Sequence, residues 1–111
     1  MIQKFTGYEI MWILVFYDLP TETKKERKAA AKFRKDIMSD GFTMFQFSIY
    51  IRHCATMDNA RVHIKRVKSV LPSIGHVGIL CITDKQFEKM ELFYCKKEQA
   101  PCAPFQQLEL F

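Results

Sequence analysis

The chain has 111 residues, 49% of them hydrophobic and 14% aromatic, which fits one globular domain over residues 1–111 and excludes a disordered segment. Seventeen Lys and Arg against twelve Asp and Glu leave a formal net charge of +5, which fits simple solubility and a polyanionic partner equally well. The longest apolar run, residues 10–17, is far shorter than the roughly 20 residues of a membrane-spanning helix and lacks the features of a signal peptide. We therefore expect a cytoplasmic protein with no membrane partner.

Residues 11–17 are continuous, β-branched and aromatic, which predicts a central strand buried on both faces. A helix follows Pro20, because Thr23 and Glu26 have the spacing of a capping box. Gly41 is suited to end this helix in a left-handed conformation. The apolar residues that recur at helical spacing along it are Ala30, Phe33, Ile37 and Met38.

The composition of residues 42–53 is strongly β. Since no Gly or Pro marks a hairpin, the periodicity of the residue pattern alone predicts one long strand from Phe42 to His53. A second helix begins after Thr56 or Asp58 and stops at Pro72. Its apolar stripe consists of Ala60, Ile64, Val67 and Leu71. Residues 76–83 predict another buried strand.

This order of elements, β-α-β-(β)-α-β, predicts an α+β ferredoxin-like sandwich with both helices on one face of the sheet, over residues from about 10 to 84. The segment from about 88 to 111 is less regular. Residues 91–95 suit a strand, 96–104 a loop, and 105–111 end apolar. A short apolar end that a single sheet does not need is typical of a segment that docks on a partner, such as another subunit.

Basic residues gather on the two predicted helices. Residues 24–35 hold seven Lys and Arg and a single acid, Glu26. Four of the lysines follow helical spacing, and the second helix repeats the pattern, so two parallel helices on one side of a sheet would place two basic stripes next to each other. Solvated helix faces usually alternate in sign, so this favours nucleic acid over a merely solvated face. The residues that we expect to bind it are Lys24, Arg27, Lys28, Lys32, Arg34, Lys35, Arg61, Lys65 and Lys68.

The strand aromatics lack the glycine–aromatic pattern of an RNA-recognition strand and are more typical of a core. We therefore expect binding directed at the phosphate backbone and sensitive to salt.

The cysteines have spacings that fit neither a zinc site nor a disulfide framework, and none forms a Cys-x-x-Cys pair. We expect free thiols, as in a reducing cytosol, at Cys54, Cys81, Cys95 and Cys102.

Catalytic candidates are few, since no nucleophile–base pair or phosphate-binding loop is evident. Asp18 stands out because it ends the first predicted strand, where ligands commonly bind in open α/β sheets. Its carboxylate has two interpretations. It caps the following loop, or it holds a hard cation such as Mg²⁺, with a second Asp18 across a two-fold axis completing the site.

A series of short motifs covers nearly the whole chain in order: residues 11–20 (MWILVFYDLP), 22–27 (ETKKER), 32–35 (KFRK), 41–42 (GF), 46–50 (QFSIY), 66–72 (RVKSVLP), 82–87 (ITDKQF) and 107–111 (QLELF). Together these motifs resemble those of the CRISPR-associated "Cas-two" adaptation proteins. The last two, residues 82–87 and 107–111, are similar to variants from type II, Cas9-bearing systems.

This resemblance implies a ferredoxin-like fold, a homodimer, and C-terminal strands that pair with the sheet of the other protomer. It also implies two strands around Gln46–Ser48 in place of one. Asp18 would bind Mg²⁺ jointly with its dimer mate, one ion per dimer, and act as the catalytic carboxylate. The partner-docking residues at the apolar end would be Leu108, Leu110 and Phe111.

Three functions follow from the resemblance. The first is a subunit for CRISPR spacer acquisition that holds double-stranded protospacer DNA as a bridge between two dimers of the CRISPR integrase. The second is a metal-dependent endonuclease that uses Asp18. The third is a toxin-like endoribonuclease that acts on single-stranded RNA. The bridging role does not require Asp18.

Overall fold

The computed structural model describes residues 9–95 and 103–104. Its main sheet has four strands in the order β2-β3-β1-β4, and every neighbouring pair is antiparallel. The strands are β1 (Met11–Asp18), β2 (Thr43–Gln46), β3 (Ile49–Cys54) and β4 (His76–Thr83). Helix α1 (Lys24–Ser39) follows β1, and α2 (Met57–Ser69) follows β3. This β-α-β-β-α-β order confirms the predicted α+β, ferredoxin-like fold class.

Strand β1 is central, with β3 on one side and β4 on the other. Ile13 and Val15 are fully buried on the face that the helices cover, and Trp12 is buried on the opposite face. At the end of the strand, Phe16 and Asp18 are exposed. The prediction of a strand buried on both faces is therefore confirmed, except at the end of the strand where Phe16 and Asp18 are exposed.

Helix α1 begins as predicted. The Thr23 hydroxyl accepts a hydrogen bond from the Glu26 N–H at 3.0 Å, and Glu26 Oε1 accepts one from the Thr23 N–H at 3.0 Å. Gly41 follows the last turn with a φ of 99°, a conformation that glycine adopts readily. Met38, which we expected in the apolar stripe, is 44% exposed.

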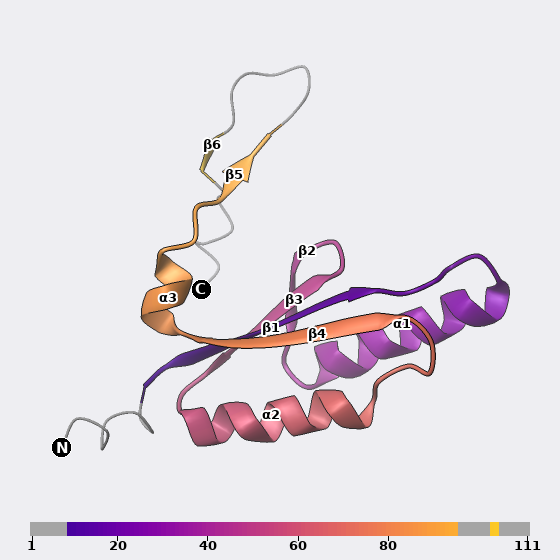
Figure 1. The fold of residues 1–111 in the computed structure, drawn as a ribbon, viewed down its shortest axis with the longest axis horizontal. Helices are drawn as coiled ribbons and strands as arrows, with labels where there is room; N and C mark the ends of the chain where they lie inside the picture. The colour runs from indigo at the N-terminus through magenta and orange to yellow at the C-terminus, as the bar shows by residue number, and fades with distance from the viewer. Residues whose placement is uncertain (1–8, 96–102, 105–111) are drawn as a thin grey trace.

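Helices α1 and α2 lie side by side against one face of the sheet (Figure 1). They run antiparallel, so the prediction of parallel helices is wrong. The reason is that α1 returns from β1 and α2 from β3, and these two strands are themselves antiparallel. On α2, His63 is buried between Ala60 and Val67, whereas Leu71 lies beyond the helix end and is 45% exposed.

Residues 42–53 do not form one strand. They form a hairpin in which Phe47 and Ser48 connect β2 to β3, as the family resemblance implied. Ser48 has a φ of 65°, so a serine takes the left-handed position that a glycine usually marks. Composition alone could not reveal this turn, because serine adopts that conformation only where the surroundings stabilise it. Here the Ser48 carbonyl accepts a hydrogen bond from the Tyr17 N–H at 3.0 Å.

The sheet face opposite the two long helices is called the open face below. A short helix, α3 (Asp84–Glu88), covers it at one end, where the ring of Phe87 stacks on that of Trp12 with 4.2 Å between centroids. Met90 and Leu92 pack against the same cluster. The other end, around Asp18, is not covered by the residues that the structure describes.

The chain continues as a two-stranded antiparallel sheet, β5 (Phe93–Tyr94) with β6 (Ala103–Pro104), which extends away from the main sheet (Figure 1). Phe93 and Tyr94 are exposed. The pairing of these strands with another protomer stays a prediction, and the expected docking residues Leu108, Leu110 and Phe111 lie outside the described residues.

Cys54 and Cys81 are free thiols, as expected. Burial raises the pKa of both, so they are thiols and not thiolates at neutral pH. Cys95 is disulfide-bonded, so the prediction of a free thiol is wrong there, and Cys102 lies outside the described residues. Within the described part of the chain, no helix combines the length and hydrophobicity that crossing a membrane requires.

Candidate nucleic-acid interface and metal site

The outer surface of the helix pair, called the helix layer here, carries the predicted basic residues. All nine are exposed, and they come from both α1 and α2. On α1, Phe33 and Ile37 face the sheet, so Lys24, Lys28 and Lys35, about half a turn away, point to solvent. On α2, the buried Ala60, His63 and Val67 place a second set on the outer side by the same argument: Arg61, Lys65 and Lys68.

Some of these basic groups already have partners. Lys32 Nζ lies 2.8 Å from Asp36 Oδ2, and Arg61 lies 3.0 Å from Asp58. The Arg27 guanidinium donates to the carbonyls of Thr21 and Glu22 at 3.2 Å. Exposed ion pairs such as Lys32–Asp36 and Arg61–Asp58 contribute roughly 0–1 kcal/mol to stability and exchange readily with other anions.

The other six predicted basic residues are the most available to bind an anionic partner. Among the residues that the structure describes, no carboxylate pairs with them. They are Lys24, Lys28, Arg34, Lys35, Lys65 and Lys68.

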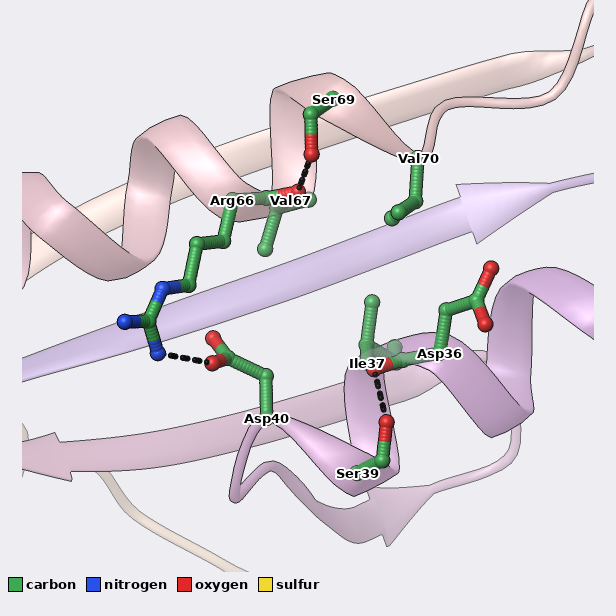
Figure 2. Close-up of a pocket in the computed structure, with 8 residues that line it drawn as sticks. All are labelled: Asp36, Ile37, Ser39, Asp40, Arg66, Val67, Ser69 and Val70. Atoms are coloured by element: carbon green, nitrogen blue, oxygen red, sulfur yellow. Dashed lines mark hydrogen bonds and ion pairs between the residues drawn. The ribbon is translucent and has the colours of Figure 1, made fainter.

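A polar cluster that the sequence analysis missed joins the two helices. Asp40, which ends α1, places Oδ1 2.8 Å from the Arg66 guanidinium and Oδ2 2.8 Å from His63 Nδ1. Figure 2 shows Arg66 reaching from α2 to Asp40 across a pocket of about 290 Å³ between the helices. Arg52 Nε also donates to the Asp40 carbonyl at 2.8 Å. These contacts fix the spacing of the helices, and therefore of their basic stripes.

Burial alone would raise the pKa of Asp40, but hydrogen bonds from Arg66 and His63 outweigh it and hold the pKa below its usual value. A carboxylate of this kind stabilises the fold above the pKa that it has in the unfolded chain, about 3.9, and this stabilisation is lost as the pH falls through the lower folded-state value. Asp40→Asn is therefore expected to lower the free energy of unfolding by about 1.5–3 kcal/mol at pH 7 and by clearly less near pH 3.

Urea denaturation of wild type and Asp40→Asn at a series of pH values measures this difference directly. Asp36→Asn is the matched control, because among the described residues its carboxylate pairs with the exposed Lys32 alone. A difference between wild type and Asp40→Asn that stays constant from pH 7 to pH 3 would contradict the assignment.

Asp18 lies at the uncovered end of the open face, in a shallow depression of about 510 Å³. Within the described residues, no hydrogen bond joins its carboxylate to the following loop, so the structure does not support the interpretation of Asp18 as a loop cap. Its neighbour across the sheet is His76 of β4. Tyr17 is not a base beside it at neutral pH, because burial and the neighbouring Tyr50 raise the pKa of Tyr17 to about 12.

Two aromatic rings border Asp18 on the same depression. Phe16 lies over Gly78, where a Cβ atom would come within 2.3 Å of its ring, so only glycine permits this placement. Phe47 projects from the β2–β3 turn and is 89% exposed. With Leu80, 48% exposed, they make the uncovered end of the open face apolar around one carboxylate. Large exposed apolar groups of this kind are typical of an interaction surface.

The donor set at Asp18 restricts the metal that it can hold. The described residues include no group of three or more His, Cys, Asp or Glu placed to bind one ion. Mg²⁺ is often bound through one or two carboxylates and several waters, so an exposed Asp18 fits it as a single ligand. A second copy packed on the open face would supply another carboxylate.

The fold and these two surfaces define a ferredoxin-like protein with a basic helix layer on one side and an exposed acid in an apolar face on the other. A family model described as CRISPR associated protein Cas2 matches residues 11–90. The chain belongs to this family, which confirms the resemblance found in the sequence.

Curated relatives agree with the family. The chain is similar to the "CRISPR-associated endoribonuclease Cas2" of Flavobacterium psychrophilum, with 62% identity over 97% of this chain and 94% of the relative. The protein of the same name from Parvibaculum lavamentivorans is 50% identical, over 91% of this chain and all of the relative. A solved structure titled "Crystal structure of cas2" aligns with a TM-score of 0.55 at 14% identity, over 86% of this chain and 98% of that one, and supports the fold.

Proposed function

We propose that the chain is a homodimeric subunit of CRISPR spacer acquisition that binds double-stranded DNA along its helix layer. The observation that carries this function is the pair of outward basic stripes on α1 and α2, which the Asp40 contacts hold side by side. Lysine side chains of one sign on adjacent helices suit the regularly spaced phosphates of a duplex.

The homodimer follows from the open face. Phe16, Leu80 and Phe47 are exposed at one end of it, and a second copy would remove them from water. Packing two open faces together leaves both helix layers outside, pointing away from each other, so the dimer would offer two basic surfaces to DNA. A protein of this form suits a bridge between two integrase dimers, with Leu108, Leu110 and Phe111 docking on the integrase.

A second function, metal-dependent nuclease activity, is favoured by the exposed Asp18 carboxylate and by the name endoribonuclease that the relatives carry. In the dimer, the two Asp18 side chains would hold one Mg²⁺ between them. A bound Mg²⁺ supplies charge stabilisation to a phosphodiester and activates water. Asp18 itself holds the ion in place. The relatives' name gives RNA as the substrate class, and the proposed substrate is single-stranded RNA.

Titration of a labelled duplex of about 30 base pairs over a range of salt concentrations tests the first function. If six to ten phosphates are neutralised, affinity should fall roughly 10³- to 10⁵-fold between 50 and 200 mM salt. Duplex binding that is absent at 50 mM, or that does not depend on salt, would contradict the proposal.

A further inference from the structure

His76 is the residue that the sheet places beside Asp18. In the antiparallel pairing of β1 with β4, the Cα partner of Asp18 is His76, the first residue of β4. Directly opposed residues of an antiparallel pair project to the same face with Cβ atoms about 4.5–5.5 Å apart. Both side chains are exposed, and both residues line the depression on the open face.

Two glycines hold this arrangement. Gly75 precedes His76 with a φ of 110°, and a Cβ atom there would come within 3.0 Å of the Asp18 carbonyl and closer still to Leu19. The start of β4 can therefore approach the end of β1 only because residue 75 has no side chain. Gly78 accommodates the ring of Phe16, as described above, which makes the surface of β4 next to the pair apolar.

The chemistry of the pair differs from that of a carboxylate alone. Carboxylate and water oxygens suit Mg²⁺, whereas a neutral imidazole nitrogen is a good ligand for first-row transition metals and a poor one for Mg²⁺. One copy supplies only two such groups, too few for a closed site. Two copies joined through their open faces would supply two carboxylates and two imidazoles.

We propose that His76 is a metal ligand alongside Asp18, and that the site shared by two copies binds Mn²⁺ in preference to Mg²⁺. This inference rests on the homodimer and the Asp18 metal site of the proposed function. It adds the second ligand and the class of ion that this ligand selects. Loss of even an outer partner of a metal ligand commonly lowers affinity about 10- to 100-fold, so loss of a direct ligand should lower Mn²⁺ affinity at least about 10-fold.

Electron spin-echo spectroscopy of Mn²⁺ bound to the purified protein tests the ligand without any activity assay. A coordinated imidazole gives ¹⁴N modulation of the Mn²⁺ signal. Calorimetric titrations with Mn²⁺ and Mg²⁺ give the two affinities and the number of ions per chain. The variants are His76→Gln, Asp18→Asn and, as a matched control, His53→Gln, since His53 is an exposed histidine at the other end of the sheet.

We expect one Mn²⁺ per two chains, with ¹⁴N modulation that His76→Gln removes and His53→Gln keeps. His76→Gln should lower Mn²⁺ affinity at least about 10-fold and change Mg²⁺ affinity less than about 2-fold. Mn²⁺ that binds through Asp18 without ¹⁴N modulation overturns the role of His76 and leaves the Asp18 site intact. Wild type that binds neither ion, or Asp18→Asn that binds both as wild type does, overturns the shared metal site itself.

Discussion

Lys28→Glu/Lys35→Glu is expected to lower the affinity for duplex DNA at least about 10²-fold at 100 mM salt. Both lysines point away from the sheet on α1, and within the described residues neither pairs with a carboxylate. Reversal removes two phosphate contacts per protomer and adds two repulsions in their place. The dependence of log affinity on log salt should become shallower by about 0.9 for each phosphate contact that is lost.

The matched control is Lys85→Glu/Lys89→Glu. It changes the net charge by the same amount, but on and just after α3, which lies on the other side of the sheet from the helix layer. This control should weaken duplex binding less than about 5-fold, because it acts only through the overall electrostatic field of the protein. Equal losses in the two double variants would show that net charge, and not the helix layer, accounts for binding.

Asp18→Asn is expected to lower metal-dependent cleavage of single-stranded RNA at least about 10²-fold, because a bound metal ion contributes several kcal/mol of charge stabilisation and each 1.36 kcal/mol is about tenfold in rate. Duplex binding should stay within about 2-fold of wild type, since Asp18 lies on the open face and the helix layer lies opposite. Labelled single-stranded RNA, single-stranded DNA and duplex DNA, each with Mg²⁺, Mn²⁺ or EDTA, measure both properties on gels.

Asp58→Asn provides the control for this experiment, because it makes the same chemical change at an exposed carboxylate on α2. Cleavage that Asp58→Asn keeps and Asp18→Asn loses would place the chemistry at Asp18. Cleavage that both variants keep would contradict the nuclease proposal at this residue. If none of the three proteins cleaves nucleic acid but all still bind the duplex, the chain is a subunit that holds DNA, and the chemistry belongs to its partner.

Much of the fold could be predicted from the sequence because its signals are local. The capping box of Thr23 and Glu26 fixes the start of α1, and β4 has the bounds that its apolar run predicted. A second capping box, Thr83 with Gln86, begins α3 and was present in the sequence, but the helix it starts is too short to show a hydrophobic period.

Other features depend on contacts between distant residues. Ser48 takes a left-handed turn conformation in a segment whose composition predicts a continuous strand. Asp40, His63 and Arg66 meet only because α1 and α2 pack together, and nothing in their spacing along the chain indicates this. Asp18 was recognised from its position after a strand, whereas His76 becomes its neighbour only through the register of β1 and β4.

Native mass spectrometry of the wild-type protein with a duplex of about 30 base pairs tests dimer formation and DNA binding in one experiment. We expect a free protein of two chains and a complex of two chains with duplex DNA, which dissociates as salt is raised. A monomer that binds no duplex at low salt would contradict both the open face as a dimer surface and the helix layer as a DNA-binding surface.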